Sequence, residues 1–175
     1  MLIKKKVCLL GAFAVGKSSL VERFVYDRFD EKYLTTIGVK VSQKILAPRR
    51  DSRSGQLRQY MFLIWDIASL DKFDHMVMNY YRGAAGALAI GDLPRPETFT
   101  GLEDLCAKFK SVSTDAEIVV LGNKLDIFQP HEETIRLLKK TAQRWSPDHL
   151  LTSAKTGHHV EKAFQLLATK IGNHS

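Results

Sequence analysis

One stretch decides the fold of this 175-residue chain: Gly11-Ala12-Phe13-Ala14-Val15-Gly16-Lys17-Ser18. It matches the pattern G-x-x-x-x-G-K-[ST], in which successive backbone N–H groups wrap a phosphate and the following helix directs its positive end at the same group. A predicted buried strand (residues 3–10) precedes the stretch and a helical pattern (residues 17–26) follows it. This context predicts a phosphate loop (residues 11–18) rather than a plain turn, with Lys17 bridging phosphate oxygens and Ser18 able to ligate Mg²⁺.

Apolar segments alternate with helical patterns along the whole chain. Strands are predicted at residues 3–10, 39–46, 59–65, 84–90, 117–121 and 149–151, and helices at 17–26, 72–81, 96–111, 132–144 and 160–171. This alternation indicates an α/β fold with a mainly parallel sheet and helices on both faces. Residues 48–55 (PRRDSRSG) predict a long hairpin loop. With no internal repeat, a single domain over residues 1–175 is expected.

Polar residues directly follow several of these strands. Asp66, Asn123 and Ser153 do so, as does the phosphate loop. Ligands of open α/β sheets bind at the carboxyl ends of the strands, so these residues are expected to meet at one edge. Asp66 is then the natural acid to act on Mg²⁺ through water.

The segment Asn123-Lys124-Leu125-Asp126 predicts which base is bound. A carboxylate at Asp126 can accept hydrogen bonds from N1 and the 2-amino group of guanine, whereas adenine presents no such pair of donors and would be rejected. In Thr152-Ser153-Ala154-Lys155, the Ala154 N–H could meet guanine O6. Alone, the N-K-x-D pattern also fits a solvated turn. Together with the phosphate loop at matching strand ends, it indicates a guanine nucleotide and argues against a P-loop kinase.

These residues together resemble the Ras superfamily of small GTPases over essentially the whole chain. Within it, Thr36-Ile37-Gly38-Val39 and Tyr80-Tyr81-Arg82-Gly83-Ala84-Ala85-Gly86 are most similar to Rab proteins. The resemblance implies a P-loop NTPase fold, with a six-stranded, mainly parallel sheet whose second strand is antiparallel and with five flanking helices. It also implies a molecular switch, in which GTP and Mg²⁺ order two loops (about residues 28–37 and 67–75) that effector proteins read.

The resemblance implies individual roles as well. Phe29 would lie against the guanine ring, Tyr33 near the phosphates, and Thr36 on Mg²⁺ and the γ-phosphate. The implied nucleotide-binding set is Phe13, Ala14, Val15, Gly16, Lys17, Ser18, Ser19, Phe29, Tyr33, Thr36, Asp66, Ser69, Asn123, Lys124, Asp126, Ser153, Ala154 and Lys155. The metal set is Ser18, Thr36 and Asp66 (through water), and the catalytic set is Lys17, Thr36 and Ser69. Effectors, an exchange factor and a GTPase-activating protein are the implied partners of a monomer, with no nucleic acid among them.

The chain departs from the family pattern where hydrolysis would occur. The family's W-D-x-A-G-Q reads Trp65-Asp66-Ile67-Ala68-Ser69-Leu70 here, so Leu70 stands where a glutamine orients the attacking water. Ser69 replaces a glycine, and the bulk of Phe13 could obstruct an arginine finger. Slow hydrolysis is therefore expected of a switch that cycles. Alternatively, the chain is an essentially non-hydrolysing GTP-binding module, whereas a water-positioning role for Asp71 would preserve activity.

Composition sets broader limits. The formal net charge is +7, which fits either a solvated basic face or an acidic partner, and the basic segment 44–58 could likewise be solvated or touch anionic lipid.

Cys8 and Cys106 lie in apolar or helical patterns and are expected to be reduced thiols of a cytoplasmic protein. Lys4–Lys6 before an apolar run resemble a signal peptide, but the run leads straight into the phosphate loop, as a buried strand would.

Membrane attachment is expected only through a lipidated segment outside this sequence. No run reaches the ~18 apolar residues needed to span a bilayer. Rab proteins usually carry C-terminal cysteines for prenylation, whereas residues 171–175 contain none. Either a lipidated tail is missing or the protein is not lipidated.

Overall fold

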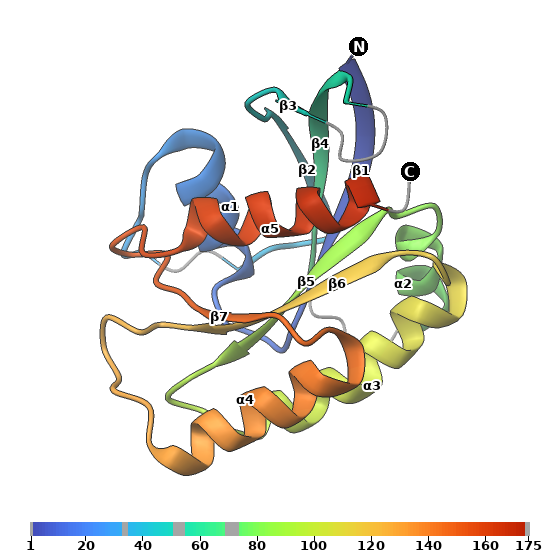
Figure 1. Ribbon diagram of the computed structural model, residues 1–175. Helices are drawn as coiled ribbons and strands as arrows, with labels where there is room; N and C mark the ends of the chain where they lie inside the picture. The colour runs from blue at the N-terminus through green and yellow to red at the C-terminus, as the bar shows by residue number, and fades with distance from the viewer. Residues whose placement is uncertain (1, 33–34, 51–54, 69–73, 174–175) are drawn as a thin grey trace.

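The computed structural model describes residues 2–32, 35–50, 55–68 and 74–173 (Figure 1). Strands and helices alternate along the chain as the sequence predicts. The strands are β1 (Leu2–Leu10), β2 (Val39–Ile45), β3 (Arg49–Arg50), β4 (Leu57–Ile67), β5 (Gly86–Asp92), β6 (Glu117–Asn123) and β7 (His149–Leu151). The helices are α1 (Lys17–Tyr26), α2 (Asp74–Tyr81), α3 (Glu97–Val112), α4 (Glu132–Trp145) and α5 (Val160–Asn173).

The main sheet has the order β2-β4-β1-β5-β6-β7. Neighbouring strands from β4 to β7 pair in parallel, and β2 pairs with β4 in the antiparallel sense. The predicted α/β fold is confirmed, with six strands on this path, an antiparallel second strand and five helices. The apolar runs in β1, β5 and β6 follow from this order, because central parallel strands are covered on both faces.

The segment at residues 48–55 differs from the prediction. A continuous hairpin loop was expected, but Arg49 and Arg50 form β3 and pair with the start of β4. Arg49 lies opposite Arg58, and Arg50 lies opposite Leu57. The physical reason is that β4 begins two residues before the predicted Gln59, so its backbone offers ladder partners to β3. Residues 51–54 lie outside the described residues.

Two hydrophobic cores lie on opposite faces of the sheet. On one face, α1 and α5 cover the sheet, and the rings of Phe24 and Phe164 stack with centroids 3.8 Å apart. On the other face, α2, α3 and α4 surround a second core that includes Tyr81. Figure 1 shows these two helical layers, with α5 crossing one face and α3 and α4 lying on the other. None of the helices, in so far as the structure describes them, is both long and apolar enough to cross a membrane.

The two cysteines belong to the second core. Cys8 and Cys106 are both free and fully buried, which confirms the predicted thiols. Burial raises the pKa of each thiol to about 12, because a thiolate would lose its hydration there. Both therefore pack as small apolar side chains rather than as reactive groups.

Two glycines allow a test of how tightly the second core is packed. A Cβ at Gly91 in β5 would overlap the fully buried Phe99 ring, whereas a Cβ at Gly101 in α3 would meet nothing within 4 Å. We expect Gly91→Ala to lower the free energy of unfolding by about 1–3 kcal/mol through overpacking. The matched Gly101→Ala should raise it by about 0.5–1 kcal/mol, because alanine favours a helix over glycine. Urea denaturation measures both, and equal changes would contradict this view of the core.

Candidate functional site

The phosphate loop connects β1 to α1 and closes back over the end of β1. Gly16, at the start of α1, has a φ of 102°, and a Cβ there would overlap the side-chain amide of Asn123. Only glycine satisfies both conditions. The first turn of α1 contains no acidic residue, so the positive end of the helix remains available to an anion.

The Lys17 side chain folds into this loop. Its ammonium donates hydrogen bonds to the carbonyl oxygens of Gly11 (2.8 Å) and Ala12 (3.0 Å). Burial lowers the pKa of Lys17 to about 8, and the nearby Asp66 carboxylate opposes that shift. A phosphate in the loop would favour the charged ammonium, because an adjacent anion stabilises a cation removed from water.

Three oxygen-bearing side chains meet beside Lys17. The Oγ of Ser18 lies 2.6 Å from Oγ1 of Thr36 and donates to Oδ2 of Asp66. Asp66 is 2% exposed, and its other oxygen, Oδ1, is buried without a hydrogen-bond partner among the described residues. Burial raises the pKa of Asp66, while the Ser18 hydroxyl and Lys17 counteract it. Hard oxygen donors and an orphaned buried acceptor suit Mg²⁺ and its water ligands, so the three predicted metal residues fit that ion.

Asn123, which ends β6, joins the phosphate loop to the segment after β7. Its Nδ2 donates to the Val15 carbonyl at 3.0 Å. Its Oδ1 accepts hydrogen bonds from Thr152 Oγ1 at 3.1 Å and from the Ala154 N–H at 3.3 Å. Asn123 is 1% exposed, so these bonds form away from water. The side chain therefore fixes the two loops relative to each other.

The Asp126 carboxylate is exposed and is oriented by a buried serine. Ser153 Oγ donates to Asp126 Oδ1 at 2.6 Å and accepts a hydrogen bond from the Thr156 N–H at 3.1 Å. The preceding turn places Lys124 at a φ of 72°. The structure thus brings together the two segments from which base recognition was predicted.

Other predicted base contacts lie around this pair. The Ala154 N–H, expected to face guanine O6, donates to Asn123 over a distance longer than the usual 2.7–3.2 Å. Lys155 Nζ lies 3.0 Å from Glu31 Oε1, and this carboxylate raises the pKa of Lys155. Phe29 is half-buried and packs against the core under α1 and α5. The start of the first predicted switch loop (residues 28–37) therefore adjoins the predicted base site.

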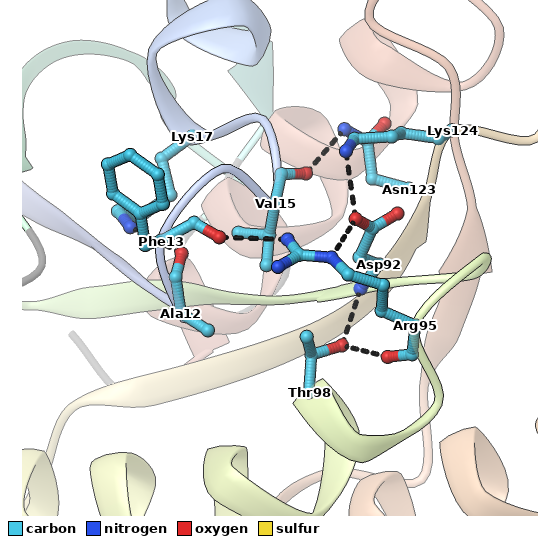
Figure 2. A network of polar contacts seen from close by, with 9 residues as sticks. All are labelled: Ala12, Phe13, Val15, Lys17, Asp92, Arg95, Thr98, Asn123 and Lys124. Carbon is cyan, nitrogen blue, oxygen red and sulfur yellow. Dashed lines mark hydrogen bonds and ion pairs between the residues drawn. The ribbon is translucent and has the colours of Figure 1, made fainter. Parts of the chain in front are cut away.

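A second network next to the site was not predicted (Figure 2). Asp92, at the end of β5, is 1% exposed, and its Oδ2 lies 2.8 Å from Lys124 Nζ and 2.7 Å from Arg95 Nε. Arg95 also donates from Nη2 to the Phe13 carbonyl at 2.8 Å. One carboxylate thus connects Lys124 to the phosphate loop. Asp92 carried the same sequence signal as Asp66, an acid closing an apolar strand, but Arg95 carried none.

Several predicted site residues contribute no side chain to the hydrogen bonds and ion pairs described above. Tyr33, Ser69, Leu70 and Asp71 lie outside the described residues. Of the others, Val15 is buried, Ala14 and Ser19 are half-buried, and Phe13 is 52% exposed. Figure 2 shows the Phe13 ring turned away from Asp92, on the side of the loop where Lys17 lies.

Comparison with known proteins assigns the chain. The family model described as Ras family matches residues 6–173. This chain belongs to the Ras family. Curated relatives of this Ras-family protein include Ras-related protein Rab-31 from Homo sapiens, which is 32% identical over 167 residues covering 95% of this chain and 82% of that protein. Ras-related protein Rab-4A from Danio rerio is 34% identical over 96% of this chain and 76% of its own length, and Rab-7b from Mus musculus is 31% identical over 94% and 81%.

The Arg95 network makes a prediction for this Ras-family protein. Arg95→Ala should remove the hydrogen bond to the Phe13 carbonyl and speed nucleotide release about tenfold. This factor is near the lower end of what a charge-assisted hydrogen bond contributes, because the Arg95 side chain is 38% exposed. Arg95→Lys should recover only part of the effect, since one ammonium does not reproduce the guanidinium fork. Release of a fluorescent guanine nucleotide into excess unlabelled nucleotide measures the rate. Arg136→Ala, on the exposed face of α4, is the control. Equal rates in both variants would exclude the network from this role.

Proposed function

We propose that this chain is a Rab-like molecular switch that binds GTP or GDP with Mg²⁺ and hydrolyses GTP slowly. Ras-family proteins of the Rab type are GTP-binding switches, which supports the first part. The observation that carries the proposal is the buried Asn123 amide, bonded both to Val15 in the phosphate loop and to the segment after β7. A nucleotide spanning the two loops would find its phosphate and base subsites at a fixed separation.

Guanine selectivity would come from Asp126. Its carboxylate is exposed toward solvent but held in one orientation by the 2.6 Å hydrogen bond from Ser153. A preoriented acceptor pair discriminates strongly, because the wrong base leaves it unpaired. Lys155 and Phe29 would flank the base, and Glu31 would hold the Lys155 side chain near the first switch loop.

The switch itself would run through Thr36. The contact of Thr36 Oγ1 with Ser18 Oγ ties the loop after α1 to the metal residues. Lys17 and the loop N–H groups would bind the β- and γ-phosphates, and Mg²⁺ would supply charge neutralisation there. Loss of the γ-phosphate would remove the contacts that hold Thr36 in this position. The loop would then become disordered, as the switch loops of GTPases do on hydrolysis.

Slow hydrolysis rests on residues that the sequence places beside the γ-phosphate. Leu70 offers no hydrogen bond to an attacking water. The exposed Phe13 ring stands at the mouth of the phosphate loop, where a GTPase-activating protein would have to insert an arginine. These features also favour the second candidate, an essentially non-hydrolysing GTP-binding module.

Effector proteins would bind beside the first switch loop. Ile37 is 93% exposed, and Val41 and Ile45 on the edge strand β2 are about half exposed. Clustered exposed apolar side chains mark interaction surfaces. A cytoplasmic setting completes the proposal, because both thiols are reduced and buried.

Base selectivity can be tested with Asp126→Asn. An amide in place of the carboxylate offers one donor and one acceptor, which match the C2 carbonyl and N1–H of xanthine. We expect the variant to lose its preference for GDP and to gain one for xanthosine diphosphate, while wild type favours GDP by several orders of magnitude. Competition binding measures this. Unchanged GDP affinity in Asp126→Asn, or equal affinity of wild type for ADP and GDP, would refute the proposed base site.

Hydrolysis can be tested with Leu70→Gln. A glutamine there should raise the single-turnover rate of GTP hydrolysis about tenfold, equivalent to about 1.4 kcal/mol off the barrier, with nucleotide affinity unchanged. Leu70→Ala is the matched control and should leave the rate low. A wild-type rate equal to that of glutamine-bearing relatives would contradict slow hydrolysis. GTP retained through purification would favour the non-hydrolysing module, and GDP would favour the cycling switch.

A further inference from the structure

A hollow of about 130 Å³ lies between the β3–β4 hairpin and the C-terminal turns of α5. Its lining includes Arg49, Arg50 and Arg58, together with Tyr60 of β4 and Thr169 of α5. Arg58 adjoins the β1–β4 pairing, which begins at Leu2 opposite Gln59, whereas the phosphate loop follows the other end of β1. The hollow is thus at the opposite end of the sheet from the candidate nucleotide site, as Figure 1 shows for β3 and the loop after β1.

The backbone pairing brings like charges together in this hollow. Arg49 and Arg58 are directly opposite each other in the antiparallel ladder. Side chains in such pairs have their Cβ atoms about 4.5–5.5 Å apart, and two like charges there destabilise the ladder. The negative end of α5 offsets part of this repulsion. An anion bound beside the two guanidinium groups would be attracted by both.

The arginine side chains differ in how firmly they are held. The Arg49 guanidinium donates to three neutral oxygens of α5: the Gln165 carbonyl (3.1 Å), Gln165 Oε1 (2.9 Å) and Thr169 Oγ1 (2.6 Å). Arg50 is exposed, and its hydrogen bond within the described part of the chain is a long one, 3.4 Å, to the Gly55 carbonyl. One cation is therefore preoriented on the helix, and a second can turn toward a ligand.

Gly172 of α5 leaves space at the base of the hollow. A Cβ at Gly172 of α5 would lie only 3.2 Å from the Tyr60 hydroxyl, so the glycine lets α5 lie close to β4 without filling the space above. Guanidinium groups bind phosphate oxygens through paired N–H donors, and clusters of arginines are the usual protein partners of phosphate monoesters.

We propose that this hollow binds a phosphate monoester, independently of the nucleotide. The group could belong to a phosphorylated lipid headgroup or to a soluble phosphorylated molecule. Arg49, Arg50 and Arg58 supply the donors, and the hairpin end of the sheet faces the ligand.

The first experiment titrates inositol 1,4,5-trisphosphate into the protein by calorimetry, with excess GDP·Mg²⁺ present to occupy the phosphate loop. We expect binding that Arg50→Gln/Arg58→Gln weakens about tenfold or more, as for the loss of at least one charge-assisted hydrogen bond. Lys139→Gln/Lys140→Gln removes the same charge from the exposed face of α4 and should leave the affinity unchanged. Thermal unfolding checks that each variant is folded. The single variant Arg50→Gln, which alters only an exposed side chain, should also weaken binding.

Three results would overturn the proposal: no binding of the trisphosphate, equal weakening in both double variants, or binding that occurs only in a parallel titration without GDP·Mg²⁺. A second arm identifies the source of the phosphate by using phosphatidylcholine vesicles with 5 mol% phosphatidylinositol 4,5-bisphosphate. Arginine-dependent sedimentation with these vesicles supports a lipid headgroup. Binding of the trisphosphate without sedimentation supports a soluble ligand. Equal sedimentation with phosphatidylserine vesicles of the same charge would overturn the proposal, because it would show surface attraction only.

Discussion

A single buried amide holds the candidate site together. Asn123 donates to the phosphate loop and accepts from two groups of the segment after β7, almost without exposure to water. Removing it would leave a carbonyl, a hydroxyl and an N–H without partners, and each unpaired buried group costs about 1–3 kcal/mol. The same amide explains why residue 16 is glycine. The loop, the base segment and the start of α1 all depend on this side chain.

Two acids lie at the carboxyl ends of β4 and β5, which flank β1 in the sheet, and they have different partners. Asp66 meets the hydroxyls of Ser18 and Thr36, which leave its carboxylate with capacity for a cation. Asp92 meets the cations of Lys124 and Arg95, which already balance its charge. The partners, rather than the position at the end of a strand, therefore separate a carboxylate with capacity for a cation from one that braces loops. In a fold of this kind, an acid at the sheet edge needs its neighbours before a role can be given to it.

The sequence carried most of this arrangement because the deciding features are local. Apolar runs predicted the strands, and the two nucleotide motifs marked the edge where Asn123 and Asp126 lie. The antiparallel β2 came from the family resemblance, since an edge strand alternates weakly and exposes Val41. β3 escaped prediction because two arginines have no strand pattern, and their pairing depends on where β4 begins. The Arg95 bridge depends on a contact across 82 residues that no local pattern encodes.

The stacked rings of Phe24 and Phe164 bear on how the protein matures during synthesis. α1, which begins within the phosphate loop, packs against α5 as well as against the sheet, and the segment that orients Asp126 immediately precedes α5. A nascent chain that has emerged only as far as β6 already contains the phosphate loop but has neither its supporting helix nor the second half of the base site. On the proposed function, nucleotide binding during synthesis would wait until residues 153–164 are free to fold. The nucleotide would then stabilise the completed domain rather than its first half.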